Sequence, residues 1–472
     1  MRATIAQNEE LLKELEELIR AHRGIFKQER VYQRIYGLVY GKLAAFGRHT
    51  LSQMILVLGL VNEDWTAWYR IFNQGRFSEE RVREVLFKEL LKHVEANGLL
   101  VVGGDGMQTP RTGKRIEGVG YVRNYRTPPF KVGIHLAQRW FHGAVFLPEE
   151  NGYTRAVTLW MMAAFTEKAQ RKQTPACKEW QAAHRYLEWI NAALQRAERM
   201  TQAVLFVADG SYDCLDFWRG LNSAVVALIR TAKNRALFAL PPQERHGNRK
   251  YGPQLPSPEQ LWRETAKRHW LWLTLTIRGR VRRLRYRLVG PVLRKPLADR
   301  PLFLIVVGGE QYHRHGHKHH REPLAYLVSA KQDEHGQWVL PLPIATLLLW
   351  AWQRWELEVT HRELKSHFGL GQMQGWTPAA ALASVAFSAW VYSLCVLAGY
   401  RTWGLTAGPP PPTPWWRGAG RWSFNTLWRA FRAALWGEHR FQASWSAILD
   451  NWSENRPVLP LLRDAAFASV RL

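Results

Sequence analysis

Cysteine is scarce in this sequence: 472 residues hold three, Cys177, Cys214 and Cys395, and none lies in a Cys-x-x-Cys pair. That spacing excludes a disulfide framework and a thiolate metal site, and it fits a reducing compartment. The first segment, MRATIAQNEELLKELEELI, is charged and has no apolar signal core, so secretion is not expected. The chain is therefore predicted to work in the cytoplasm.

Long apolar runs are also rare. One stretch without charged residues, Ala379 to Gly399, has the length of a membrane span. Its Ala, Ser and Gly content and the lack of a second span favour a buried core helix over a membrane-associated protein. No membrane partner is expected.

Acidic residues are few relative to basic ones. The chain has 39 Asp and Glu against 65 Lys and Arg, a formal net charge of +26. Clustered Lys and Arg bind polyanions with a gain from counterion release, so nucleic acid is the expected partner.

The length predicts about three domains. Residues 1–97 have apolar positions at helical spacing and predict a helical domain. Within it, residues 49–72 combine a helix, a turn at Gly59 and a second helix, which fits either DNA-end binding by a helix-turn-helix or a plain helical scaffold.

Residues 98–230 predict a mixed α/β unit. Apolar, β-branched segments at 99–105, 114–125 and 130–140 indicate a three-stranded meander. Helices are expected at 154–170, 178–200 and 216–221, and buried strands at 203–209 and 223–234.

Residues 231–340 predict a basic, β-rich insertion with 21 Lys or Arg and 8 Asp or Glu, which is half of the net charge of the chain. Alternation in RVRRLRYRLVG places its arginines on one face of a strand, where a phosphate backbone could lie. The predicted DNA contacts there are Arg280, Arg282, Arg283, Arg285 and Arg287.

The rest of the chain is predicted to be helical. Residues 341–400 hold one helix over 346–370 and then the apolar helix already described. Residues 401–472 form a tail with a Pro-rich linker, GPPPPTP, and a helical apolar stripe.

Three acids occupy positions that are unfavourable for a carboxylate without a function. Asp105 and Asp209 end apolar strands, and Glu358 lies between apolar helix neighbours. Carboxylates from adjacent strand ends and a nearby helix can hold two Mg²⁺ ions about 4 Å apart, with Mn²⁺ as a substitute, for phosphoryl transfer. Asp213 and Asp216 are alternatives to Asp209, but they lie past the strand end.

The context of these acids resembles the transposases of bacterial insertion sequences, whose Asp-Asp-Glu triad lies on a ribonuclease H-like fold. One branch carries Tyr, two residues, Arg, three residues, Glu, six residues, Lys; Arg354, Glu358 and Lys365 match, and Ala351 stands at the Tyr position beside Trp352. GDGMQTPRTGKRIEGVG around Asp105, with Lys114, is similar to the first-aspartate motif of a related branch, and ADGSYD to the second motif. Residues 99–375 carry the resemblance.

The resemblance implies a ribonuclease H-like catalytic core, residues 98–230 and 341–400, interrupted by the insertion. It implies metal-dependent cleavage at transposon ends and cut-and-paste strand transfer into target DNA, with Asp105, Asp209 and Glu358 as catalytic metal ligands. DNA contacts are implied for Arg354, Arg362, Lys365, Trp352 and Lys114. Its partners would be double-stranded DNA, as terminal inverted repeats and target, and a second copy in a homodimeric synaptic complex, on the nucleoid.

Two other interpretations of the function stay open. A domesticated, catalytically silent transposase would keep DNA binding alone, and a ribonuclease H-like repair nuclease would cleave without strand transfer. A flipped base of a hairpin end would need an aromatic platform, for which Trp262, Trp270 and Trp272 are candidates, although such indoles more often pack in a core or on a strand face. The histidine-rich tract, residues 312–322, has no four-ligand zinc spacing and fits a basic DNA-facing loop better.

Overall fold

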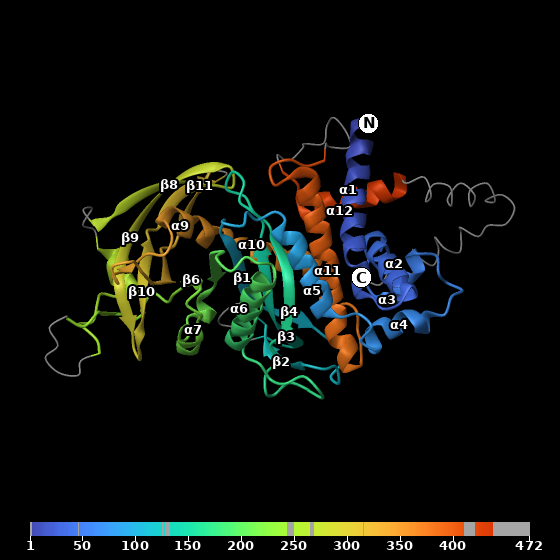
Figure 1. Cartoon of the computed structure of the whole chain (residues 1–472), viewed down its shortest axis with the longest axis horizontal. Helices are drawn as coiled ribbons and strands as arrows, with labels where there is room; N and C mark the ends of the chain where they lie inside the picture. Colours follow the sequence, from blue (N-terminus) through green and yellow to red (C-terminus); the bar gives the residue numbers. More distant parts are fainter. Residues whose placement is uncertain are drawn as a thin grey trace.

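The computed structural model describes residues 2–45, 47–124, 127, 133–242, 250–264, 269–314, 316–409 and 421–437. The molecule is elongated, with a helical region at one end, a sheet in the centre and a strand-rich region at the other end (Figure 1). Most of the Pro-rich linker, the tail beyond residue 437 and His315 of the histidine-rich tract lie outside the described residues.

The N-terminal region is helical, as predicted. Side-chain oxygens of Thr50, Asp64 and Ser78 accept hydrogen bonds from backbone amides and fix where three of its helices begin. The elements are α1 (Arg2–Ala21), a 3-10 turn (Arg23–Ile25), α2 (Glu29–Ala44), α3 (Leu51–Val57), α4 (Trp65–Asn73) and α5 (Glu79–Leu91).

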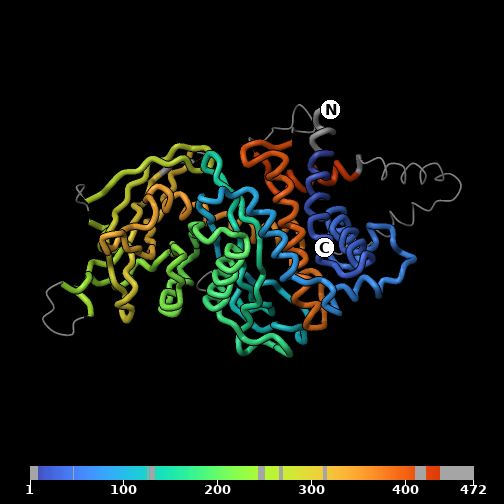
Figure 2. Tube along the Cα trace, in the orientation of Figure 1, coloured from blue at the N-terminus to red at the C-terminus, as the bar shows by residue number. Residues whose placement is uncertain are grey.

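The apolar stretch forms a core helix, α11 (Pro378–Trp403). Among the described residues it is the one helix long and apolar enough to cross a membrane, but 89% of its apolar window is buried inside the protein. It packs against α1, α4, α5 and strand β4 (Ala156–Ala163), and α12 (Phe424–Gly437) packs against α1 and α11. The trace shows these last helices beside the first ones (Figure 2). The expected core helix is confirmed.

The central sheet has the strand order of a ribonuclease H-like core. Strands β1 (Leu100–Pro110), β5 (Val204–Ala208) and β6 (Val225–Arg230) are parallel neighbours. Strand β3 (Ile134–Phe146) pairs antiparallel with β1, and β4 pairs antiparallel with β3, so the order is β4-β3-β1-β5-β6. The predicted mixed α/β fold is confirmed.

Two predictions about these strands were wrong. The first three strands do not form a meander, because β3 lies between β1 and β2 (Val119–Arg123). Residues 156–163, predicted as helix, form β4. Both faces of β4 contact other side chains, so the alternation that marks a half-exposed strand is missing, and its Ala, Leu and Met residues favour a helix by propensity.

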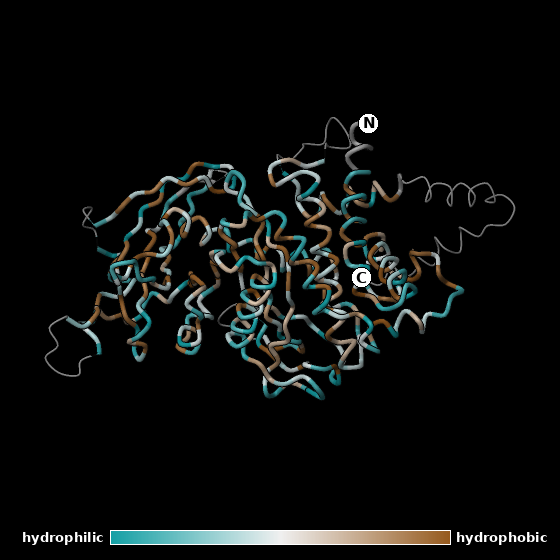
Figure 3. Tube along the Cα trace, in the orientation of Figure 1, coloured by the Kyte–Doolittle hydropathy of each residue, from teal (hydrophilic) through white to brown (hydrophobic). Residues whose placement is uncertain are grey.

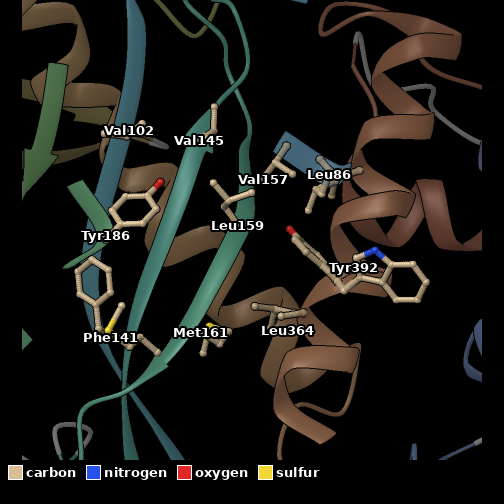
Figure 4. Packing of buried hydrophobic residues seen from close by; sticks show 14 of the residues in the cluster. Leu86, Val102, Phe141, Val145, Val157, Leu159, Met161, Tyr186, Leu364 and Tyr392 are labelled. Carbon is tan, nitrogen blue, oxygen red and sulfur yellow. The ribbon is translucent and has the colours of Figure 1, made fainter. Parts of the chain in front are cut away.

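Helices cover both faces of the sheet. Phe206 and Ala208 belong to the cluster that contains Tyr186 of α6 (Glu179–Arg196) and Phe217 of α7 (Leu215–Gly220). Leu205 and Val207, the alternate positions, pack with α9 (Ile344–Gln353) and α10 (Trp355–Ser366). Near β3 and β4 the core joins α5, α10 and α11 (Figure 4), and hydrophobic stretches run through the centre of the molecule (Figure 3).

The helix predicted over residues 346–370 is in fact two. Helices α9 and α10 are separated at Arg354, and α10 ends at Ser366. Gly369 follows in a left-handed conformation, φ 63°.

Residues 231–340, the predicted basic insertion and from here on the basic block, do not form a sheet of their own. Strand β13 (Leu324–Ser329) pairs antiparallel with β6, so the central sheet continues as β6-β13-β10-β9 and reaches eleven strands. The other elements are β7 (Phe238–Ala239), α8 (Pro258–Arg263), β8 (Leu271–Ile277), β9 (Arg280–Arg294), β10 (Leu297–Val307), β11 (Glu310–Arg314), β12 (His317–Arg321), β14 (Lys331–Gln332) and β15 (Trp338–Val339).

Candidate active site

The two aspartates lie side by side on one face of the sheet. Strands β1 and β5 run parallel, and their last paired residues are Gly104 and Ala208, directly before Asp105 and Asp209. Side chains alternate along a strand, so Asp105 shares its face with Val101 and Asp209 shares its face with Val207. Both valines pack toward α9 and α10. The acids therefore face the helices that carry the third acid.

Helix α10 lies directly on β1 at Gly103. A Cβ atom there would stand 2.7 Å from Phe146 Cε2 and 3.0 Å from Leu357 Cδ1, closer than side chains pack. Glycine thus lets the first turn of α10 approach the strand. Glu358 follows Leu357 in that turn, which brings its carboxylate near Asp105.

Arg354, at the junction of α9 and α10, joins two of the acids. Its Nη2 donates a hydrogen bond of 2.6 Å to Oε1 of Glu358, and its Nη1 lies 3.8 Å from Oδ2 of Asp105. Burial opposes the charge of this guanidinium, but Asp105 and Glu358 outweigh it and raise the pKa of Arg354. The predicted Arg-Glu spacing is thus a direct contact in the structure.

Asp105 titrates far from its ordinary range. Burial and, after it, the charge of Asp209 raise its pKa to about 7, and Arg354 only partly offsets them. An acid that is hard to ionise beside another acid needs a nearby cation to become fully charged. Within the described ranges, no three His, Cys, Asp or Glu side chains stand close enough together to hold a metal ion as they are. The carboxylate oxygens are nonetheless the donors that Mg²⁺ prefers.

A cleft of about 770 Å³ opens beside these acids. Asp209, Glu358 and Arg354 line it together with Glu322 and Trp262 from the basic block. Its remaining charged lining is Arg230, Lys233, Arg263 and Glu259, and Glu259 lies 3.7 Å from Lys233 and 2.6 Å from Arg263. The cleft therefore offers both carboxylates and cations, as a phosphodiester substrate would require.

The two alternative aspartates have other surroundings. Asp213 is fully buried, and its carboxylate lies 2.5 Å from Arg235 and 2.6 Å from Arg294 and accepts a hydrogen bond from Trp218. Asp216 is half exposed on α7 and pairs with Arg219. Asp213 is saturated by partners, and Asp216 points to solvent. Of these three aspartates, Asp209 alone lines the cleft.

The predicted basic residues of β9 divide between two faces of the strand. Arg283 and Arg285 are exposed and lie over the rings of Trp272 and Trp270, at 4.5 and 4.8 Å. Arg287 is on the same face but buried, and it donates to Glu264 and to the carbonyl of Leu261.

Arg280 and Arg282 lie on the other face of β9. There they line a second cavity, of about 540 Å³, with Arg362 of α10. The prediction that one face of the strand carries all five arginines was therefore wrong: strict alternation is broken by the Arg282-Arg283 pair.

The other predicted DNA contacts are spread around the acids. Lys114 is exposed in the loop between β1 and β2, and Lys365 is half-buried in the last turn of α10. Trp352 is half-buried with the guanidinium of Arg321 5.4 Å from its ring, while Ala351, at the tyrosine position, is buried in the core. Trp352 therefore does not occupy the place of that tyrosine.

A pair of buried histidines beside Asp105 was missed in the sequence. His142 Nδ1 lies 2.8 Å from His361 Nε2, and His361 Nδ1 lies 3.9 Å from Oδ2 of Asp105. Burial lowers the pKa of His142 to about 3 and that of His361 well below its ordinary value, so both rings are neutral. The histidines are 219 residues apart, and only the position of His361 one turn after Glu358 hinted at a role.

The histidine-rich tract forms the β11-β12 hairpin. His317, His319 and His320 are exposed, and His320 Nδ1 lies 3.3 Å from Glu322 Oε1. In the described part of the tract no metal-ligand cluster is present.

A family model described as DDE superfamily endonuclease matches residues 26–284, which is more than half of the chain. The match contains Asp105 and Asp209 and ends before Glu358. No curated protein matches the chain. Among solved structures, the piggyBac transposase in a synaptic complex with hairpin DNA, determined by cryo-EM, is similar with a TM-score of 0.30 and 9% identity. That similarity covers 84% of this chain and 66% of the other. By its family match, the chain belongs to the DDE endonuclease superfamily.

Proposed function

We propose that this member of the DDE endonuclease superfamily is a transposase of the insertion-sequence type, which cuts transposon ends and joins them to target DNA. The observation that carries the proposal is that Asp209, Glu358 and Arg354 line one cleft, while Arg354 also lies 3.8 Å from Oδ2 of Asp105. Carboxylates and an arginine gathered at one cleft suit phosphodiester chemistry.

The three acids would hold divalent metal, Mg²⁺ or Mn²⁺. The high pKa of Asp105 supports this fit, because a cation there removes the cost of ionising a buried carboxyl beside Asp209. Bound metal would activate water, and then a 3′-hydroxyl, and would neutralise charge on the phosphate. Arg354 positions Glu358 through its 2.6 Å hydrogen bond. Two strands of the sheet hold the aspartates in place: Asp105 lies within β1, which continues to Pro110, and Asp209 directly follows β5.

DNA would approach along the basic surfaces that flank the acids. Arg362, Arg280 and Arg282 converge on the cavity at the side of α10, and among the described residues no acidic side chain lies within ion-pair distance of Arg280 or Arg362. Arg283, Arg285, Lys114, Lys365 and Trp352 extend the proposed contacts. Arg287 does not belong to them, since Glu264 neutralises it in the interior.

Trp262 is the candidate platform for a flipped base. Of the three indoles considered, it alone lines the cleft beside Asp209 and Glu358. Trp270 is buried. Trp272, on β8, has its ring covered by the guanidinium of Arg283 from β9. A base extruded from a hairpin end could stack on Trp262 while its phosphate lies at the acids.

The proposed partners are the terminal inverted repeats, the target duplex and a second copy of the chain, because two DNA ends must be held together for joining. The expected place of work is the nucleoid in the cytoplasm.

The test compares wild type with Glu358→Gln on a DNA duplex that carries the sequence flanking the gene, with Mg²⁺ and a supercoiled target. Cleavage and joining should both fall by more than about 100-fold, since losing even an outer partner of a metal ligand costs 10–100-fold. Glu322→Gln is the matched control, because that acid lines the same cleft but is 83% exposed.

Three results would contradict the proposal. Equal cleavage by wild type and Glu358→Gln would show that Glu358 is not a catalytic metal ligand. Binding without cleavage by the wild type would favour a domesticated DNA-binding protein. Cleaved ends without joined product would favour a repair nuclease.

A further inference from the structure

Three polar side chains form a buried chain that ends at Asp105. Thr158 Oγ1 lies 2.9 Å from His142 Nε2, and His142 Nδ1 lies 2.8 Å from His361 Nε2. His361 Nδ1 then lies 3.9 Å from Oδ2 of Asp105. We call Thr158, His142 and His361 the imidazole relay.

The relay is a product of the strand register. Asp105 of β1 pairs with His142 of β3, so their side chains lie on the same face of the sheet. Thr158 of β4 pairs with Ala144, two residues along β3, and thus also lies on this face. His361 comes down from α10, one turn after Glu358. Three strands and the helix of the third acid therefore meet at the relay.

The proton positions of the relay follow from Asp105. An ionised carboxylate only accepts hydrogen bonds, so His361 must carry its proton on Nδ1 to face Asp105 favourably. Neutral His361 then accepts at Nε2 from His142 Nδ1, and neutral His142 accepts at Nε2 from the Thr158 hydroxyl. Each imidazole then uses one donor and one acceptor, in the same direction along the chain. The 3.9 Å step is longer than a hydrogen bond, so His361 acts on Asp105 through its N–H dipole.

Packing alone does not account for this arrangement. His142 is 0% exposed and Thr158 is 2% exposed, and two neutral imidazoles in such a site cost more desolvation than leucines of similar size. Their polar groups satisfy one another, and the chain continues to the carboxylate of Asp105, while the charged side chains of Lys365 and Arg354 also lie near enough to act on His361.

We propose that the imidazole relay is a positioning network that holds the carboxylate of Asp105 in its metal-binding state. This inference rests on the proposed function, since it treats Asp105 as a metal ligand. His142 and His361 would act as outer partners, and changing such partners weakens metal binding by about 10- to 100-fold. Neither histidine touches the substrate in this proposal.

The test measures Mn²⁺ binding to the intact protein by the electron paramagnetic resonance signal of free Mn²⁺, without DNA or turnover. His142→Leu and His361→Leu should each raise the Mn²⁺ dissociation constant by about 10- to 100-fold. The double variant should be little worse than either single one, because the relay works as a unit. His142→Asn, whose amide can donate from the position of Nδ1, should recover most of the affinity.

His22→Leu is the matched control. His22 is also 0% exposed and hydrogen-bonded, through Nδ1 to the carbonyl of Leu18 and through Nε2 to the indole N–H of Trp390, but it lies in the helical region. It should lower the melting temperature about as much as His142→Leu and leave Mn²⁺ affinity unchanged.

The outcomes distinguish a failure of the relay proposal from a failure of the proposed function. If wild type binds Mn²⁺ and His142→Leu binds it equally well, or if His22→Leu weakens binding as much, the relay is overturned and the proposed function stands. If wild type and Asp105→Asn both fail to bind Mn²⁺, the metal site itself is wrong and the relay falls with it.

Discussion

Replacing Asp105 by Asn should stabilise the metal-free protein above neutral pH. Burial and the charge of Asp209 raise the pKa of Asp105 to about 7 from its ordinary value of 3.8. Because the folded-state pKa lies above the unfolded one, ionising this acid costs folding free energy. The cost is absent below about pH 4, grows as the pH rises and is complete above about pH 7.

The size of the effect follows from the same pKa values. A difference of this size corresponds to about 4 kcal/mol at most, and relaxation around a side chain that is 14% exposed reduces it to about 2 to 4 kcal/mol. Asn has nearly the same shape as Asp and carries no charge, so Asp105→Asn should gain this amount at pH 8 and nothing at pH 4.

Urea unfolding between pH 4 and pH 8, in the presence of a chelator, measures this gain. Asp209→Asn should flatten the pH dependence of the remaining Asp105, because it removes the charge that does most to raise this pKa after burial. Asp64→Asn should change little, since Asp64 is an exposed N-cap and Asn caps a helix equally well. If Asp105→Asn is no more stable than wild type at pH 8, or if its advantage does not shrink toward pH 4, the electrostatic argument is refuted.

Two further predictions concern how the site is held. Gly103→Ala should lower the free energy of unfolding by about 1 to 3 kcal/mol and abolish most of the cleavage activity, because the new methyl group pushes Leu357, and with it α10, away from β1. Urea unfolding measures the first effect and a cleavage assay measures the second. A stable, active variant would contradict the close packing. Asp213→Asn should cost about 3 to 5 kcal/mol because it leaves Arg294 buried without its partner, whereas Asp216→Asn should cost less than about 1 kcal/mol. Similar losses of stability for these two variants would show that Asp213 is not the structural acid.

The candidate acids could be proposed from the sequence because their signal is local. An apolar run followed by an aspartate marks both Asp105 and Asp209, although β1 continues past Asp105 to Pro110, so the expected strand end there was wrong. The short spacing between Arg354 and Glu358 fits one helical turn. The structure places these residues together. The sequence could not separate Asp209 from Asp213 by spacing alone; that distinction depends on Arg294, which comes from β9, 81 residues later.

The predictions that were wrong concern contacts between segments far apart in the sequence. Strand β4 has the composition of a helix, and only its position between β3 and α11 makes it a strand. The order of β2 and β3 depends on which strand meets β1, a choice that the local pattern does not contain. The histidines of the relay come from β3 and α10, and no short motif links His142 to His361. Each error concerns residues whose environment is created by distant segments.

The continuity of the sheet bears on how DNA binding and cleavage would be coupled. Strand β6 pairs with β5 on one side and with β13 of the basic block on the other. Asp209 follows β5, and Glu322 and Trp262 of the basic block reach the same cleft. A block joined by a flexible linker could bind DNA without placing it; one hydrogen-bonded into the catalytic sheet fixes its basic surface relative to Asp209. Under the proposed function, the position of a phosphate on the basic block would therefore determine where the neighbouring phosphodiester meets the acids.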